Sequence, residues 1–238
     1  MIRIGIILGS TRPGRRGEQV AKWVYEKASR RSDAEFEVID LFDHPLPHLD
    51  EPAPAVATPG RYQHEHTRAW ADTIASFDGF VMVSPEYNHS VPGAFKNAID
   101  YLYVEWNNKA VGFVSYGSVG GARAVEQLRL ICGALQMADV APQVTLSLLT
   151  EFENYAIFKP GDHNVTALDT LLDQVVAWST ALAPLRAAPP GRRRLTRRFH
   201  TEQKDGQLCP HNARWTKPRS GSRSTRWSKV SEPRISKA

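Results

Sequence analysis

Glycine, hydroxyl and guanidinium groups are concentrated in residues 9–17, whose sequence is GSTRPGRRG. Ser10 and Thr11 offer hydroxyl donors, and Arg12 offers a planar guanidinium that suits a phosphate group. The segment opens onto a helical pattern, and a helix N-terminus attracts anions through its unpaired N–H groups and its positive dipole end. It contains neither G-x-x-x-x-G-K-[ST] nor G-x-G-x-x-G, which argues against a nucleotide triphosphatase and an ordinary dinucleotide-binding domain. These residues predict a phosphate-binding loop, with a solvated surface loop as the alternative.

Two further segments are suited to hold a planar ligand. Residues 84–93, SPEYNHSVPG, are stiffened by two prolines, and Tyr87 between them offers a flat apolar ring. Residues 116–121, YGSVGG, contain glycines that let the backbone approach a ligand closely. An ordinary turn between a strand and a helix is the alternative interpretation of each segment.

Strand and helix patterns alternate along residues 1–186. Residues 2–8 are a nearly continuous apolar run, as expected of a strand buried on both faces of a parallel sheet. Five repeats of strand and helix predict an open parallel sheet, because parallel strands require crossover connections. Five prolines in residues 43–60 predict a long irregular loop, and Pro142 indicates that the last strand lies at a sheet edge. The other strands are expected at residues 36–41, 79–84, 110–115 and 140–146, and the helices at residues 20–28, 62–76, 93–101, 123–135 and 165–185.

The three segments follow the first, third and fourth strands, so they should converge at the carboxyl edge of the sheet, where such folds bind ligands. Together they resemble the NADPH-dependent FMN reductase family of the flavodoxin-like fold. The resemblance rests on residues 9–15, 84–100 and 117–123, and it covers about residues 1–185. It implies a three-layer α/β sandwich with a five-stranded parallel sheet of order 2-1-3-4-5 and a non-covalently bound FMN.

The resemblance also implies which residues bind FMN. It places the first segment and the start of the following helix at the ribityl phosphate, residues 85–88 along the isoalloxazine ring, and residues 115–121 on the other side of that ring, near its pyrimidine end. It implies no catalytic side chain, because the cofactor supplies the reactive atoms. The residues assigned in this way are Ser10, Thr11, Arg12, Gly17, Glu18, Gln19, Pro85, Glu86, Tyr87, Asn88, Ser115, Tyr116, Gly117, Ser118, Gly120 and Gly121.

The activity implied by the resemblance is hydride transfer from NADPH or NADH to bound FMN and onward to free flavin, a quinone or a similar small acceptor. Backbone N–H groups in residues 117–121 would steady the negative charge that develops on the flavin. Such enzymes associate as homodimers or homotetramers, and residues 93–106 are candidates for the interface, with core packing as the alternative for their aromatic side chains. An electron carrier like flavodoxin, without NAD(P)H turnover, is the alternative within redox chemistry.

Other residues with chemical potential are interpreted as structural. His64 and His66 are two positions apart and should not share a helix face, so no metal site is expected. Cys132 lies in a predicted helix, where a buried and inert thiol is the usual finding. Cys209 and His211 are too few ligands for a metal site. His89 is expected to be an exposed loop histidine rather than a proton donor.

Charge divides the chain into two parts. Residues 1–186 hold 16 Lys and Arg against 22 Asp and Glu, a net charge of −6, whereas residues 187–238 hold 14 against 3, a net charge of +11. The first part is predicted to be one domain, in which Arg12, Arg15 and Arg16 would attract an anion. The second is predicted to be a disordered basic tail, which either lacks a selected function or contacts nucleic acid or anionic lipid.

Two cysteines, no apolar run long enough to span a membrane and no secretory signal pattern lead us to expect a cytoplasmic protein without membrane contact.

Overall fold

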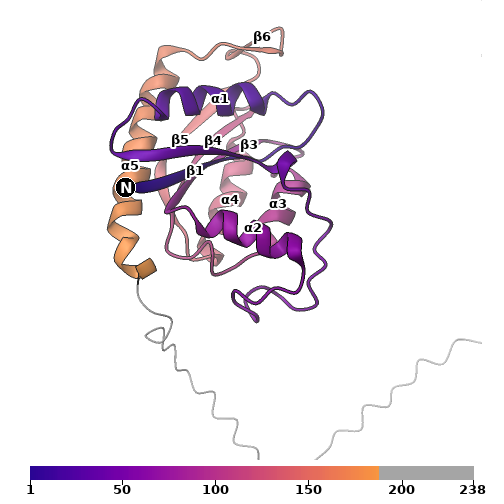
Figure 1. The fold of residues 1–238 in the computed structure, drawn as a ribbon. Helices are drawn as coiled ribbons and strands as arrows, with labels where there is room; N and C mark the ends of the chain where they lie inside the picture. Colours follow the sequence, from indigo (N-terminus) through magenta and orange to yellow (C-terminus); the bar gives the residue numbers. More distant parts are fainter. Residues whose placement is uncertain (188–238) are drawn as a thin grey trace, which may run out of the picture. The chain divides into compact units, whose positions relative to one another are not determined.

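Five parallel strands form the central sheet of residues 1–187, the part of the chain that the computed structural model describes (Figure 1). The predicted basic tail, residues 187–238, lies outside the described residues except for Ala187. The strands of the main sheet are β1 (Ile2–Leu8), β2 (Ala34–Asp40), β3 (Gly79–Pro85), β4 (Ala110–Gly117) and β5 (Ala138–Ser147). The helices are α1 (Gly17–Ala28), η1 (Leu41–Asp43), α2 (Glu65–Ala75), α3 (Gly93–Asp100), α4 (Ala122–Ala134) and α5 (Asp162–Ala187).

The strand order is β2-β1-β3-β4-β5, and every neighbouring pair is parallel, which confirms the predicted topology. The three central strands are apolar because both of their faces are covered, and β3 is buried along its whole length. β5 lies at an edge of the sheet, as predicted. Pro142 has no N–H to donate, and an edge strand tolerates this because one of its sides pairs with no other strand within residues 1–187.

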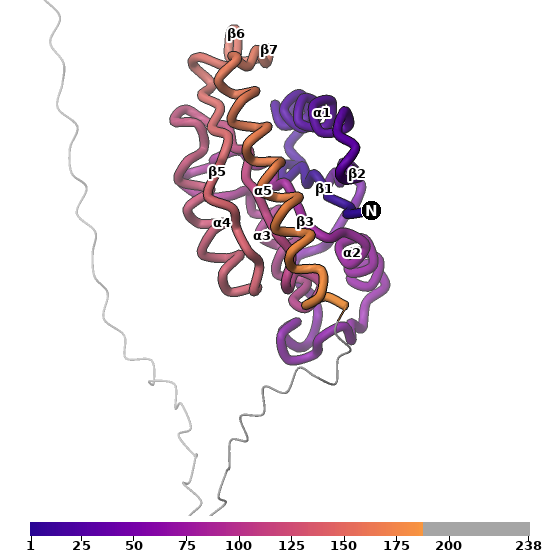
Figure 2. The backbone as a smooth tube through the Cα atoms, turned by 90° about the vertical axis from the view of Figure 1, so that its left-hand side faces the viewer, coloured from indigo at the N-terminus to yellow at the C-terminus, as the bar shows by residue number. Residues whose placement is uncertain are grey.

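Two hydrophobic clusters lie on opposite faces of the sheet. On one face, α1 and α5 pack on β1, β3, β4 and β5, and α5 runs along the sheet past β5 (Figure 2). On the other face, α2, α3 and α4 enclose an aromatic core that includes Trp70, Phe80 and Trp106. These two layers of helices leave the carboxyl edge of the sheet to the connecting loops.

A short antiparallel hairpin of β6 (Phe152–Glu153) and β7 (Ile157–Phe158) follows β5, and the sequence did not indicate it. Its strands are two residues long, too short for an alternating pattern to show. Its turn uses Asn154 and Tyr155 at φ of 52° and 56°, without the glycine that usually marks such turns. Phe152 and Phe158 pack on each other and on Tyr116 and Trp23.

No helix within residues 1–187 is long and apolar enough to cross a membrane.

Candidate functional site

The loops after β1, β3 and β4 meet at the carboxyl edge of the sheet. The first two are joined by a hydrogen bond between the hydroxyls of Ser10 and Tyr87, whose oxygens are 3.1 Å apart. The second and third are joined where the Glu86 N–H donates to the Tyr116 carbonyl at 2.9 Å. The strand order reverses between β1 and β3, so this is the edge at which such sheets bind ligands. The structure therefore brings the three predicted segments together.

The first loop ends in an uncapped helix N-terminus. Arg16 is the N-cap residue of α1, and its side chain makes no capping hydrogen bond. First-turn N–H groups and the positive end of the helix dipole favour an anion at such a terminus. Packing beneath this turn requires glycine, because a Cβ on Gly17 would lie 2.6 Å from Leu8 Cδ1 and 2.7 Å from the Tyr116 hydroxyl. The buried hydroxyl of Ser10 lies at the start of the same loop.

The three arginines of this loop have different surroundings. Arg12 is exposed and forms no ion pair within residues 1–187. The Arg15 guanidinium is buried and forms an ion pair with Asp40 at 2.5 Å. Arg16 donates to the Tyr155 carbonyl at 2.8 Å. The expectation that all three attract an anion is therefore corrected for Arg15, because a carboxylate already neutralises its charge.

The side chains of Glu18 and Gln19 bind protein groups. The Glu18 carboxylate accepts from Arg15 Nε at 2.9 Å. The Gln19 amide donates to the Ala156 carbonyl at 2.8 Å and accepts from the Phe158 N–H at 2.9 Å, so it holds the β6–β7 hairpin against α1. The Gln19 N–H donates to the Arg16 carbonyl at 3.2 Å, so at these two positions only the backbone N–H of Glu18 remains to face an anion.

The second loop contains a tight turn between its two prolines. Tyr87 and Ser90 exchange two backbone hydrogen bonds, of 2.9 and 3.1 Å. Asn88 and His89 between them have φ of 50° and 67° and are exposed. The half-buried Tyr87 ring has the Arg12 guanidinium carbon 6.0 Å from its centroid. This turn presents an aromatic face, an amide side chain and free backbone groups to one side of the site.

Glu86 connects the second loop to α4. Its carboxylate accepts from Arg123 Nε at 2.6 Å and from the Arg123 N–H at 3.1 Å, at the first turn of that helix. Burial opposes ionisation, but the hydrogen bonds and charge of Arg123 outweigh it, so the pKa of Glu86 lies below its ordinary value. This carboxylate fixes the loop, and the buried Pro85 precedes it at the end of β3.

The third loop is shaped by two glycines. Gly120 and Gly121 have φ of 71° and 76°, and a Cβ on Gly121 would lie 2.7 Å from the Ser115 Cβ. The Ser115 hydroxyl donates to the Gly120 carbonyl at 2.7 Å and so closes the turn. Ser118 and Val119 are exposed at its tip, directly after Gly117. The turn leaves its tip open to a ligand.

Tyr116 lies apart from the rest of the third segment. Its ring packs against Phe152 on the face covered by α1, and its hydroxyl lies against Gly17. Burial raises the pKa of this hydroxyl, so it remains protonated. The structure thus places Tyr116 beside the N-terminal turn of α1, whereas residues 117–121 form the turn between β4 and α4.

The residues present fit FMN. An uncapped helix N-terminus and the hydroxyls of Ser10 and Thr11 suit its phosphate, and the Tyr87 ring suits its planar heterocycle. The nearby carboxylates of Asp40 and Glu86 are paired with guanidinium groups, so they do not oppose an anion.

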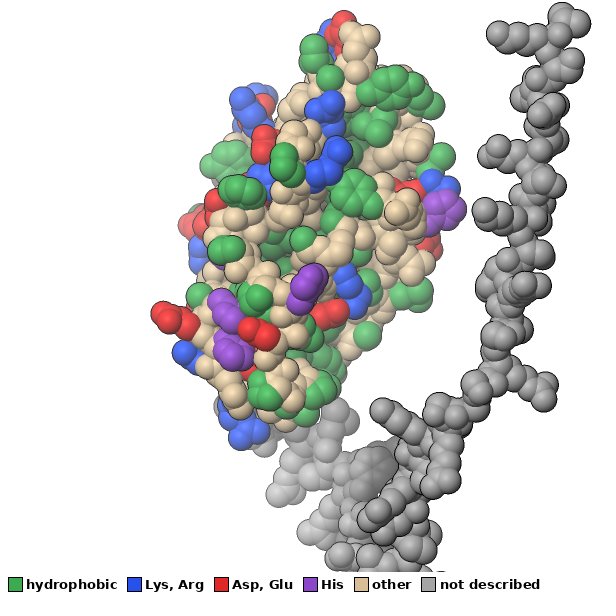
Figure 3. Space-filling view, turned by 90° about the vertical axis from the view of Figure 1, so that its right-hand side faces the viewer, with side chains coloured by type: hydrophobic (Ala, Val, Ile, Leu, Met, Phe, Trp, Pro, Cys, Tyr) green, Lys and Arg blue, Asp and Glu red, His purple; other side chains and the backbone are tan. Residues whose placement is uncertain are grey.

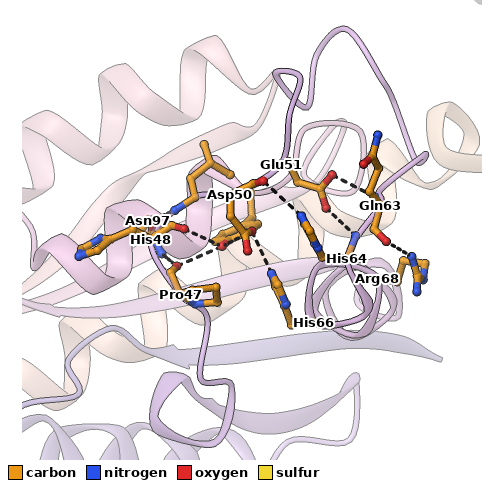
Figure 4. A network of polar contacts seen from close by, with 11 residues as sticks. Pro47, His48, Asp50, Glu51, Gln63, His64, His66, Arg68 and Asn97 are labelled. Carbon is orange, nitrogen blue, oxygen red and sulfur yellow. Dashed lines mark hydrogen bonds and ion pairs between the residues drawn. The ribbon is translucent and has the colours of Figure 1, made fainter.

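The histidines for which no metal role was expected lie at the start of α2, His64 directly before the helix and His66 in its first turn (Figure 4). The premise that both lie within one helix is wrong, because His64 precedes the helix as its N-cap, and its ring stacks on that of His66 with centroids 5.2 Å apart. Both bind Asp50, His66 through its carboxylate at 3.0 Å and His64 through its carbonyl at 3.2 Å. Within residues 1–187 no group of three His, Cys, Asp or Glu could hold a metal ion.

Further residues from the sequence have structural positions. Cys132 is buried in α4, as predicted, and burial raises the pKa of its thiol to about 12. Tyr101 and Trp106 are fully buried, which favours core packing over an interface for these two aromatic residues. Cys209 and His211 lie outside the described residues.

Comparison with protein families gives a match over residues 2–150 to NADPH-dependent FMN reductase. An NAD(P)H-dependent FMN reductase of Schizosaccharomyces pombe is 42% identical over 146 residues, which are 60% of this chain and 73% of that protein. A 2-hydroxy-1,4-benzoquinone reductase of a Burkholderia species is 32% identical over 192 residues, 74% of this chain and 96% of that protein.

Solved structures share the fold. A flavoenzyme NAD(P)H:(acceptor) oxidoreductase of Paracoccus denitrificans superposes with a TM-score of 0.58 at 20% identity, covering 76% of this chain and 98% of that one. The apo form of an NADH:FMN oxidoreductase gives 0.56 at 19% identity, covering 80% and 93%. Each is similar to this chain in the order and packing of its elements.

Proposed function

Because the chain belongs to the NADPH-dependent FMN reductase family, we propose that it passes hydride equivalents from NAD(P)H through bound FMN to free flavin, a quinone or a similar small acceptor. The chain is an oxidoreductase of a family that uses FMN with NAD(P)H as electron donor. The observation that carries the proposal is the convergence of an uncapped helix N-terminus, an aromatic turn and a glycine turn at one edge of the sheet.

The phosphate end of the proposed site is formed by the first loop. Ser10 and Thr11 offer hydroxyls, Arg12 offers an unpaired guanidinium among the described residues, and the backbone of Gly17 and Glu18 offers N–H groups. The Ser10 hydroxyl and the N–H groups of the helix are fixed before the ligand arrives, because Ser10 is buried and α1 is anchored to the sheet. Their role is to bind and orient the cofactor.

The ring end is formed by the second and third loops. FMN, when bound, supplies the redox chemistry, so the protein needs no nucleophile. Tyr87 and Asn88 border one side of the proposed ring site, and residues 117–121 border the other. Backbone N–H groups of the third loop are fixed dipoles that would stabilise negative charge at the pyrimidine end.

The names of the relatives support two acceptors, free FMN for the Schizosaccharomyces pombe protein and a quinone for the Burkholderia protein. The Burkholderia protein named above is a quinone reductase that this chain matches over 96% of its length. No residue of the described site distinguishes NADH from NADPH, so both are used as electron donors in the test.

The visible spectrum of the purified protein tests the proposal. We expect the absorption bands of a bound flavin, bleaching on addition of NADPH or NADH, and steady oxidation of the nicotinamide when a benzoquinone is supplied. A colourless protein that takes up no added FMN would contradict FMN binding. Tight FMN binding without nicotinamide turnover would instead indicate an electron carrier.

A further inference from the structure

Arg15 is held in the interior of the first loop by four hydrogen bonds. Its Nη1 donates to the Ser10 carbonyl at 2.5 Å and to Asp40 Oδ1 at 2.8 Å, its Nη2 to Asp40 Oδ2 at 2.5 Å, and its Nε to Glu18 Oε1 at 2.9 Å. The side chain is 7% exposed. A guanidinium has five N–H donors, so four are already committed. Arg15 is therefore ill suited to be a direct ligand of an anion.

Asp40 extends this contact to a second element. It ends β2, and its carboxylate holds Arg15 in a bidentate pair while Oδ1 also accepts from the Phe42 N–H at 2.9 Å, at the start of η1. The guanidinium carbon of Arg15 lies 5.6 Å from the centroid of the Phe42 ring. One ion pair therefore fixes the loop after β1 to the segment after β2.

The consequence for the site passes through Ser10. Arg15 fixes the Ser10 carbonyl, and the Ser10 hydroxyl is in turn bonded to the Tyr87 hydroxyl of the second loop. A loop rich in glycine and free of its own regular structure needs such an internal clamp to hold its donors in one arrangement. The same clamp ends at Glu18, in the first turn of α1.

We propose that Arg15, held by Asp40, is a positioning residue that shapes the phosphate-binding loop and thereby sets the preference of this protein for FMN over riboflavin. The inference rests on the proposed function, because it assumes that the loop binds the FMN phosphate. Arg15 acts through Ser10 and the backbone of residues 10–17, and its own charge is cancelled by Asp40.

The substitution Asp40→Asn separates this role from direct binding. If Arg15 were a ligand of the phosphate, removal of the neighbouring carboxylate would free its charge and leave FMN binding equal or tighter. If Arg15 is a positioning residue, the same substitution loosens the clamp and weakens FMN binding. The signs of the two expectations are opposite.

The experiment measures the dissociation constants of FMN and riboflavin by quenching of flavin fluorescence in the full chain. We expect Arg15→Gln and Asp40→Asn each to weaken FMN binding about tenfold, since small displacements of binding groups have effects of this size or larger. Riboflavin binding should change less than threefold in each variant. The double variant Arg15→Gln/Asp40→Asn should bind FMN as tightly as the single variant with the lower FMN affinity, because both substitutions remove the same clamp.

Arg15→Lys keeps the charge without the bidentate geometry and should fold where Arg15→Gln does not. It is expected to lose FMN affinity by several-fold. The matched control is Arg186→Lys, because Arg186 forms a similar pair with Asp78 at 2.8 Å, next to the first residue of β3 at the opposite edge of the sheet. This control should lower the melting temperature and leave both flavin constants unchanged.

Unchanged or tighter FMN binding in Asp40→Asn, equal losses for FMN and riboflavin, or additive losses in the double variant would overturn the positioning role. Failure of the unmodified chain to bind FMN would overturn the proposed function as well, so the two failures are distinguishable.

Discussion

At the scale of single residues, the site depends on a few close contacts rather than on reactive side chains. The carboxylates of Asp40 and Glu86 are each paired with an arginine, so they shape loops instead of taking part in proton transfer. Gly17 is the clearest case of a residue whose identity is set by packing, because a Cβ there would lie within 2.7 Å of both Leu8 and the Tyr116 hydroxyl. The identity of this glycine follows from packing beneath α1.

We therefore expect Gly17→Ala to destabilise the fold by about 1–3 kcal/mol, the cost of forcing a methyl group into a well-packed site, and to weaken FMN binding because the first turn of α1 must move. Chemical denaturation and a flavin titration measure the two effects. Gly133→Ala is the control, because nothing lies within 4 Å of its added Cβ in α4. It should gain up to about 1 kcal/mol from helix propensity, and a loss in the control equal to that in Gly17→Ala would refute the packing explanation.

At the scale of elements, the β6–β7 hairpin is the part of the site region that lies beyond the family match, which ends at residue 150. It is attached to the N-terminal turn of α1 by hydrogen bonds that its backbone makes with the side chains of Arg16 and Gln19. Its turn places the backbone of Tyr155 in the left-handed region, and the Tyr155 side chain is 61% exposed. Such a conformation costs free energy in a residue other than glycine.

Replacing this residue should relieve the cost. Tyr155→Gly is expected to raise the free energy of unfolding by about 1 kcal/mol, the difference between relief of backbone strain and the greater freedom of glycine in the unfolded chain. The Arg16 hydrogen bond is retained because it uses the backbone carbonyl. Ala156→Gly in the same turn, where φ is not positive, should lower stability instead, and denaturation midpoints that move the same way in both variants would contradict this account.

At the scale of the whole molecule, the basic character of the chain does not describe the part that forms the site. Residues 1–186 carry 16 Lys and Arg against 22 Asp and Glu, a net charge of −6. On the face drawn in Figure 3, basic and acidic side chains are interspersed. Attraction of FMN and NAD(P)H must therefore come from the local arrangement of the first loop, and not from the charge of the whole chain.

A chain shortened to residues 1–187 tests this division. Its isoelectric point should fall below 7, while its melting temperature and FMN affinity stay those of the full chain, because the described contacts of the site lie within these residues. Any salt-dependent nucleic-acid binding should disappear with the removed residues, since it requires their positive charge. Equal nucleic-acid binding by the shortened chain would place that activity in the folded part, and loss of FMN would give the removed residues a role in the site.

Homodimer or homotetramer formation and a cytoplasmic location remain predictions from the sequence. Light scattering of the purified protein measures the first.

The sequence by itself determined the order of the elements and the three loops of the site. Both follow from local features, namely apolar runs of strand length, helical spacing, and glycine and proline at the breaks, and parallel strands can be connected in few ways. The tertiary structure decided which polar groups are free. Arg15 and Asp40 are 25 residues apart, and Gln19 meets Phe158 across 139 residues, so no local pattern reports these pairs. Composition therefore predicted three anion-binding arginines where folding pairs one of them with a carboxylate and turns another toward the hairpin.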